Sequence, residues 1–248
     1  MRVKTATNGL VEISTIYYRS AYTPADFLTP KHYDIRILLE RSKAINCPSI
    51  PLQLAGGKKV QEVLTHPGVL ESFLSDDKYG VPFSEEEIGE LRSSFMAMWG
   101  LDLEDTTTHS GEEPVGVKQA REKALSLVLK PQREGGGNNV YKEDIPKFLD
   151  NLGAEEREAW VAMELIKPPP GAGNYLIRAG STELENQTPV RTEVISEIGI
   201  FGWALFGGET KSVEEREIGW LVRTKGKDSN EGGVATGFSV LDSLLLVE

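Results

Sequence analysis

KPQREGGGNN, at residues 130–139, is the most informative segment of this 248-residue chain. It follows the apolar run ALSLVL at 124–129, which predicts a buried strand. The three glycines allow positive φ angles and let the backbone approach a ligand closely. Successive amides of such a loop form a concave anion site, and Glu134 offers the hard oxygen ligand that Mg²⁺ prefers. The segment therefore predicts a loop that holds phosphate groups together with a metal ion.

The alternative for this segment is a loop without a ligand. A glycine triad by itself is most often a flexible loop, and that alternative stays open. The combination of lysine, glutamate, three glycines and two asparagines at one strand end favours a ligand. The segment is not a Walker A loop, because no Gly-Lys-Ser/Thr closes it. It also lacks the Gly-x-Gly-x-x-Gly pattern, which argues against a Rossmann or protein-kinase assignment.

Composition excludes several classes of protein. The chain has 27 basic and 38 acidic residues, a net charge of −11, which disfavours nucleic-acid binding and a polybasic membrane anchor. No apolar run approaches the roughly 18 residues of a membrane-spanning helix, and the N-terminus lacks a signal-peptide pattern. Cys47 is the single cysteine, so no intrachain disulfide is expected, and we expect it to be buried. These features predict a cytoplasmic protein with no nucleic-acid or membrane partner.

Metal-site and hydrolase patterns are not seen in the sequence. The three histidines, His32, His66 and His109, lie far apart and show no metal-ligand spacing. A Gly-x-Ser-x-Gly elbow, which would indicate a serine hydrolase, does not occur in the sequence. A metal site built from histidines and a serine hydrolase are therefore not indicated.

The first half of the chain is predicted to be mainly helical. A strand at 10–18 and a proline-containing loop at 19–30 come first. Helices are expected over 31–46, 58–65, 67–74 and 84–99. The apolar face of the first helix would contain Ile35, Leu38, Leu39 and Ile45, opposite Arg36, Glu40, Arg41 and Lys43. Ser84 and Glu87 form a capping box, and an acidic loop follows at 101–114.

The second half is predicted to be mainly sheet. One short helix is expected at 143–151, and the apolar segment at 159–166 predicts a strand. Further strands are expected over 175–178, 191–198, 200–206 and 218–223. Their short connections indicate an antiparallel sheet, and a second glycine-containing loop follows at 225–233. The chain is therefore assigned to the α+β class, with a nucleotide gripped between layers by two glycine-rich loops.

Eight motifs, in order, resemble those of the eukaryotic-type glutathione synthetase family. They are Tyr18–Tyr22, Leu38–Ser42, Gln53–Val60, Lys130–Asn139 with Tyr141, Met163–Ile166, Ser196–Phe201, Arg223–Lys225 and Gly232–Ala235. The resemblance covers nearly the whole chain except the acidic segment near 75–118. It implies an ATP-grasp fold with part of a substrate-binding subdomain at 1–47 and an ATP-binding domain at 48–248. The lid loops would be 130–141 and 225–237.

The resemblance also implies an activity. Members of the family join glycine to γ-glutamylcysteine with ATP and Mg²⁺, through an acyl phosphate, and form homodimers. The protein's task in such a reaction is to position the partners and to neutralise developing charge. The implied partners are therefore the small molecules ATP, γ-glutamylcysteine and glycine, and a second copy of the chain.

The matched motifs imply particular site residues. Lys58 and Lys130 would contact phosphates, and Glu134 would bind Mg²⁺. The other nucleotide contacts would be Gly135, Gly136, Gly137, Asn138, Asn139, Tyr141, Met163, Glu164, Leu165, Ile166, Glu197, Lys225 and Glu231. Substrate contacts would be Arg19, Ser20, Ala21, Tyr22, Arg223, Val234 and Ala235. Arg223 and Lys130 are the residues expected to take part in catalysis.

Some of these residues would be assigned differently without the motifs. Arg19 or Arg223 alone would be assigned to a surface salt bridge, and Tyr22 alone to the core. In the motif context a guanidinium suits a peptide carboxylate, which it can bind through two parallel hydrogen bonds. Glu197 on an apolar strand would be costly to bury unless it is paired.

The sequence departs from the family at its N-terminal side. Family sequence before the strand that ends at Arg19 has no counterpart here, and that part carries further Mg²⁺ ligands and substrate contacts. The alternative function is therefore a catalytically incomplete ATP-binding or interaction module, and poor solubility or association of the chain is expected. A third alternative is an ATP-grasp ligase with other substrates, against which Arg19, Tyr22 and Val234-Ala235 argue.

Overall fold

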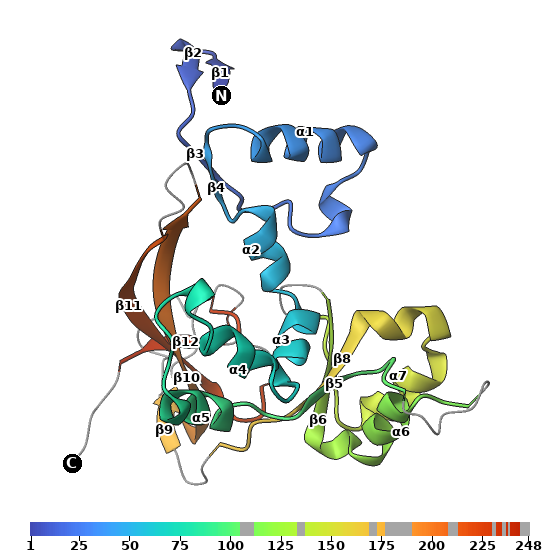
Figure 1. The fold of residues 1–248 in the computed structure, drawn as a ribbon. Coiled ribbons are helices and arrows are strands. Elements are labelled where there is room, and N and C mark those ends of the chain that lie inside the picture. Colours follow the sequence, from blue (N-terminus) through green and yellow to red (C-terminus); the bar gives the residue numbers. More distant parts are fainter. Residues whose placement is uncertain are drawn as a thin grey trace. The chain divides into compact units, whose positions relative to one another are not determined.

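The computed structural model describes residues 1–104, 112–132, 137–168, 173–176, 190–207, 213–229, 232–234, 237 and 239–243. The chain forms two compact units, residues 1–166 and 167–248 (Figure 1). The first unit combines helices with small sheets, and the regular structure described in the second unit consists of strands. The predicted α+β class is therefore confirmed.

Two small sheets lie at the start of the first unit. They are the antiparallel pair β1 (Arg2–Thr5) and β2 (Gly9–Glu12), and the parallel pair β3 (Thr15–Tyr17) and β4 (Ile45–Cys47). The 3₁₀ turn η1 (Pro24–Asp26) and helix α1 (Pro30–Glu40) connect β3 to β4. The prediction of one strand over 10–18 is wrong, because residues 13 and 14 separate β2 from β3. Cys47 is exposed, so its predicted burial is also wrong.

Helix α1 differs from its prediction in both length and orientation. It ends at Glu40, earlier than predicted, because residues 45–47 pair with β3 instead. Arg36, expected on the polar face, is only 5% exposed, whereas Leu38, expected on the apolar face, is 66% exposed. The Arg36 guanidinium lies 3.6 Å from the ring centroid of Tyr18 and donates to Glu40 at 2.8 Å. A planar guanidinium can be buried in this way because stacking and an ion pair replace its contacts with water.

The next segment of the first unit is helical. Its elements are α2 (Ile50–Ala55), α3 (Lys58–Thr65), α4 (Val69–Leu74), the 3₁₀ turn η2 (Asp77–Tyr79) and α5 (Glu85–Ser93). The helices predicted at 58–65 and 67–74 are confirmed, and so is the capping box of Ser84 and Glu87. The prediction that the last helix continues to residue 99 is wrong, because residues 98–100 form a strand.

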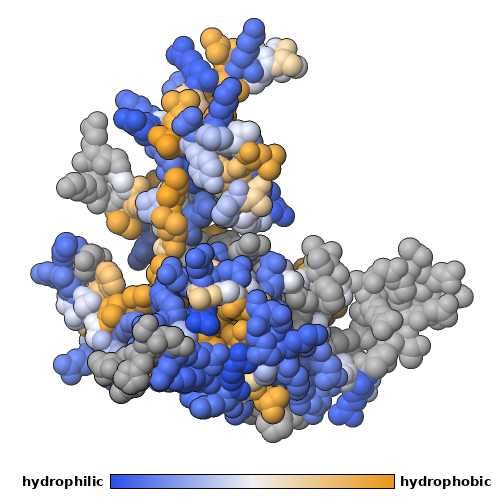
Figure 2. Space-filling model, turned by 90° about the vertical axis from the view of Figure 1, so that its right-hand side faces the viewer, coloured by the Kyte–Doolittle hydropathy of each residue, from blue (hydrophilic) through white to orange (hydrophobic). Residues whose placement is uncertain are grey.

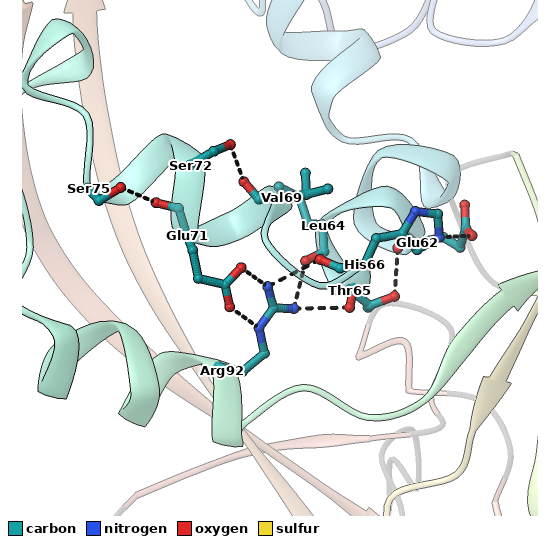
Figure 3. A network of polar contacts seen from close by, with 9 residues as sticks. All are labelled: Glu62, Leu64, Thr65, His66, Val69, Glu71, Ser72, Ser75 and Arg92. Atoms are coloured by element: carbon teal, nitrogen blue, oxygen red, sulfur yellow. Dashed lines mark hydrogen bonds and ion pairs between the residues drawn. The ribbon is translucent and has the colours of Figure 1, made fainter.

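One arginine joins three of these helices (Figure 3). Arg92 of α5 donates to both carboxylate oxygens of Glu71 in α4, at 2.8 and 2.6 Å. It also donates to the carbonyl oxygens of Leu64 and Thr65, at 2.8 and 3.1 Å, where α3 ends. The bond from Arg92 holds the pKa of Glu71 below its usual value. The C-terminal end of α3 is thereby fixed to its neighbours.

A four-stranded antiparallel sheet with strand order β5-β8-β6-β7 completes the first unit. Its strands are β5 (Met98–Gly100), β6 (Leu127–Pro131), β7 (Val140–Tyr141) and β8 (Trp160–Glu164). The accompanying elements are α6 (Val115–Glu122), η3 (Ala124–Ser126), α7 (Asp144–Asn151) and η4 (Ala154–Ala159), and α6 and α7 lie beside each other (Figure 1). The helix predicted at 143–151 and the strand at 159–166 are confirmed. The strand predicted at 124–129 begins only at Leu127, because η3 precedes it.

The two faces of this sheet carry different side chains. Adjacent residues of a strand point to opposite faces, and directly paired residues share a face. The core face consists of Trp99, Leu127, Leu129 and Ala162, which pack with Val117 and Ala120 of α6 and Ile145 and Leu149 of α7. The other face carries a row of paired residues, Met98, Met163, Val128 and Tyr141, with Lys130 next to Val128 along β6. One face thus packs against α6 and α7, while on the other face Val128 is buried and Lys130, Tyr141 and Met163 are partly buried.

The second unit contains one antiparallel sheet with strand order β12-β11-β10-β9. Its strands are β9 (Gly173–Leu176), β10 (Val190–Phe206), β11 (Val213–Gly226) and β12 (Val240–Asp242). The predicted antiparallel arrangement is confirmed. The two strands predicted at 191–198 and 200–206 form one continuous strand, because Gly199 keeps its pairing with Leu221. A register shift at Phe201 and Gly202 bends the pair without ending it.

Apolar side chains also reach the surface. Figure 2 shows them between hydrophilic residues on the face in view. In the second unit, the paired residues Ile200 and Trp220 are 64% and 53% exposed. Within the described ranges, no helix combines the length and apolar character needed to cross a membrane.

Candidate functional site

Three of the predicted nucleotide contacts lie on the sheet face opposite the core. Lys130 of β6, Tyr141 of β7 and Met163 of β8 are all partly buried there, and Tyr141 and Met163 pair with Val128 from its two sides. The side-chain amide of Asn139 donates to the Tyr141 hydroxyl at 3.2 Å. This face therefore offers apolar surface for a flat base next to a cation for phosphate.

The segment after Met163 is fixed through its backbone. The N–H of Glu164 donates to the Ala97 carbonyl at 3.0 Å, and the N–H of Leu165 donates to the Ser126 carbonyl at 2.9 Å. Ile166, just beyond β8, is 77% exposed. The strand end thus has an exposed apolar side chain and a fixed backbone, and its place beside the adenine ring stays a prediction.

Lys58 is the first residue of α3 and follows Gly57, the N-cap. Its ammonium donates to the Gln61 side chain at 3.1 Å, a neutral partner. The neighbouring Lys59 is instead paired with the Glu62 carboxylate at 3.1 Å. Both lysines lie at the N-terminal end of a helix, which favours anions. Because the partner of Lys58 is neutral and that of Lys59 is a carboxylate, Lys58 is the better placed of the two to bind a phosphate.

One residue that sequence reasoning missed connects the first turn of α3 to the segment that begins the glycine-rich loop. Gln132 lies two residues after Lys130, and its side-chain oxygen accepts a hydrogen bond from the backbone N–H of Lys59 at 2.9 Å. The N–H of Gln132 donates to the Ala159 carbonyl at 3.0 Å. The sequence holds no signal for the contact with Lys59, because the partners lie 73 residues apart.

The predicted substrate loop at 19–22 has a constrained shape. Ala21 has φ +66°, a backbone conformation that non-glycine residues rarely adopt. The carboxylate of Asp26, a second residue that sequence reasoning missed, accepts hydrogen bonds from the N–H groups of Tyr22 and Thr23, at 3.2 and 3.1 Å. Tyr22 is 40% exposed, so the alternative that it belongs to the core is wrong.

The Asp26 carboxylate gives this loop a pH dependence. Hydrogen bonds, foremost that from Thr23, hold its pKa below the usual value. Its stabilising effect is therefore present above the pKa of the unfolded chain, roughly 4, and is lost as the pH falls through the lower folded pKa. We expect Asp26→Asn to lower the urea midpoint at neutral pH. The difference from the unsubstituted chain should shrink below about pH 4; an equal difference at every pH would contradict the assignment.

Three predicted contacts from the second unit lie on one face of the β10–β11 pair. Arg223 of β11 is directly opposite Glu197 of β10, and its guanidinium donates to that carboxylate. Lys225 lies two residues further along β11 and is partly buried. Glu197 is exposed as well as paired, so it carries no cost of a buried charge. The alternative assignment for Arg223 was a surface salt bridge, and Arg223 does form one. Its partner, Glu197, is itself a predicted nucleotide contact.

On the opposite face of the same strands, polar side chains form a row of hydrogen bonds. Thr224 is fully buried, and its hydroxyl lies 2.8 Å from the Ser196 hydroxyl and donates to the Asp242 carboxylate at 2.7 Å. These contacts join β10, β11 and β12. They fix the strands from which Glu197 and Arg223 project.

Several predicted positions lie outside the described residues. These are Glu134, Gly135, Gly136, Glu231 and Ala235. Of the two loops, residues 130–132, 137–141, 225–229, 232–234 and 237 are described, and Gly137 has φ +85°. The described part of the chain brings no three His, Cys, Asp or Glu side chains together as metal ligands. The predicted Mg²⁺ ligand, Glu134, is not among the residues described.

The mixed first unit with its four-stranded antiparallel sheet, and the antiparallel sheet of the second unit, agree with the expected ATP-grasp class. The family model for the eukaryotic glutathione synthase ATP-binding domain matches residues 2–246. The chain belongs to this family.

Similar proteins carry glutathione synthetase names. The glutathione synthetase large chain of Schizosaccharomyces pombe is 40% identical over 238 residues, which cover 96% of this chain and 43% of that protein. Glutathione synthetase of Bos taurus is 42% identical, covering 94% and 44%. The chloroplastic glutathione synthetase of Arabidopsis thaliana is 39% identical, covering 95% and 39%. This chain therefore spans about two fifths of the length of these relatives.

One solved structure supports the fold. A glutathione synthetase-like effector from Globodera pallida, in its apo form, aligns with a TM-score of 0.54 and 24% identity. The alignment covers 86% of this chain and 40% of the other.

Proposed function

We propose that this chain carries the ATP-binding part of a glutathione synthase, the ligase that joins glycine to γ-L-glutamyl-L-cysteine with ATP and Mg²⁺. The observation that carries the proposal is the family match across residues 2–246. The placement of Lys130, Tyr141 and Met163 on one sheet face supports its nucleotide part.

In the proposed reaction, the dipeptide carboxylate attacks the γ-phosphorus of ATP and releases ADP. The glycine amine then attacks the acyl phosphate, loses a proton and displaces inorganic phosphate. Lys58 and Lys130 would bind phosphate oxygens and offset the negative charge of the transferring group. Glu134 would hold Mg²⁺, which adds further charge neutralisation. The glycines and asparagines of 135–139, with Tyr141, would close over the nucleotide and exclude water.

The remaining roles follow the motif assignments. Met163–Ile166 would line the adenine, and Glu197, Lys225 and Glu231 would complete the nucleotide contacts. Arg19–Tyr22 and Arg223 would bind the peptide, with Val234 and Ala235 as its cover. A guanidinium has five N–H donors, so the ion pair of Arg223 with Glu197 leaves others for a carboxylate. We also propose residues 1–47 as substrate subdomain and 48–248 as ATP-binding domain, a cytoplasmic location and a homodimer.

A second candidate is an ATP-binding module without ligase activity. The observation that favours it is length, since the chain spans about two fifths of its relatives. The two candidates agree on nucleotide binding and differ in turnover.

A coupled assay of ADP release separates the candidates. It would be run with MgATP, γ-glutamylcysteine and glycine, and with each substrate omitted in turn. Release that needs all three, and that Glu134→Gln abolishes, supports the ligase. ATP binding by calorimetry without turnover supports the module. A chain that binds no ATP contradicts both.

A further inference from the structure

Helix α3 lacks an N-terminal cap of its own. The first N–H groups of a helix have no partner within it, and Ser, Thr, Asn or Asp normally supplies one from the N-cap. The N-cap of α3 is Gly57, which has no side chain, and the first turn has no acidic residue. It carries Lys58 and Lys59 instead, whose charges oppose the helix dipole. The end of α3 that bears Lys58 therefore needs support from elsewhere.

That support comes from Gln132, which directly follows the strand that bears Lys130. The side-chain oxygen of Gln132 accepts the Lys59 N–H at 2.9 Å. The approach of Gln132 is close: a Cβ on Gly57 would lie 3.6 Å from the same oxygen, in ordinary van der Waals contact, and 3.1 Å from the Leu54 carbonyl oxygen. The Gln132 backbone is itself fixed, since its N–H donates to the Ala159 carbonyl just before β8.

The other end of α3 is also fixed, by Arg92 (Figure 3). A helix held at its C-terminal end and capped by Gln132, just after β6, cannot shift its first residue without breaking the Gln132 contact. Gln132 and Lys130 are on the same strand end, so the cap sets where Lys58 lies relative to Lys130. Gln132 itself is exposed, so its substitution leaves the core intact.

We infer that Gln132 is a positioning residue that holds Lys58 and Lys130 at one fixed separation, as a triphosphate bound by both lysines requires. The inference rests on the proposed nucleotide site. Gln132 acts through Lys58, so its effect on ATP should depend on the presence of Lys58. A residue that supports only the fold would act equally with and without it.

The hydrogen bond is tested without nucleotide by amide exchange. In Gln132→Met, which keeps the side-chain length but removes the acceptor, the Lys59 amide should exchange about fivefold faster. Gln132→Glu keeps an acceptor oxygen, so protection of that amide should be retained. Unchanged exchange in Gln132→Met would overturn the inference.

The positioning role is tested by a double-mutant cycle on the full chain, with the MgATP dissociation constant measured by calorimetry. Gln132→Met should weaken binding about fivefold, and Lys58→Met at least as much. In the Lys58→Met background, Gln132→Met should have no further effect. Losses that multiply, or no loss in Gln132→Met alone, would overturn the inference and leave the proposed function intact. Unchanged binding in Lys58→Met would instead remove Lys58 from the nucleotide site, and the inference with it.

Discussion

Lys130→Met is expected to weaken MgATP binding about 10- to 100-fold, the range for loss of a charge-assisted hydrogen bond to phosphate. The reason is the register of the sheet. Lys130 lies on the same face as Tyr141 and Met163, opposite the face that packs on α6 and α7. Calorimetric titration with MgATP measures the effect.

A matched control removes the same charge from the other side of the sheet. Lys147 is exposed on α7, and Lys147→Met should leave the ATP dissociation constant within about twofold. The thermal midpoint should be nearly unchanged in both variants. Equal losses of affinity in the two would mean that net charge, and not the site, governs binding.

Leu129→Ala is expected to destabilise the first unit by about 2–5 kcal/mol. Leu129 directly precedes Lys130 but points to the opposite face, where it is fully buried among Leu101, Leu127 and Ile145. Truncation removes buried apolar contacts and leaves a cavity. Urea unfolding followed by tryptophan fluorescence measures the loss, since Trp99 lies in the same cluster.

Leu125 provides the control for this substitution. It lies four residues earlier in the chain and is 69% exposed, so Leu125→Ala should change stability by no more than about 0.5 kcal/mol. A small effect of Leu129→Ala would contradict the assignment of the core face. It would also remove the reason for placing Lys130 on the other face.

The part of the candidate site that depends on strand alternation and on the order of the motifs was predictable from the sequence. The apolar run before Lys130 and the segment around Met163 form adjacent strands, and the spacing along them places Lys130 and Met163 on one face. The contacts of Gln132 and Asp26 were not predictable. Each is a side-chain oxygen that accepts from backbone N–H groups, and such contacts leave no periodic pattern in the sequence.

The two helices that were predicted too long share one physical cause. Apolar residues at helical spacing predict that each helix continues, but the last residues of each predicted helix pair with a distant strand instead. Residues 45–47 pair with β3, and Met98–Gly100 pairs with β8, so both helices end before their predicted limits. Conversely, the strands predicted at 191–198 and 200–206 are one strand, because the Gly199 backbone between them pairs with Leu221. Pairing partners far along the chain override local pattern in each case.

The placement of the nucleotide base on the sheet face opposite the core is tested most directly by methyl NMR of the methionines. The chain has four, and Met98 and Met163 are paired neighbours on that face. With MgATP, the ring current of the adenine should shift the Met163 methyl signal strongly and the Met98 signal to a lesser degree, while Met1 stays unchanged. Saturated ATP binding with an unmoved Met163 signal would contradict the proposed site.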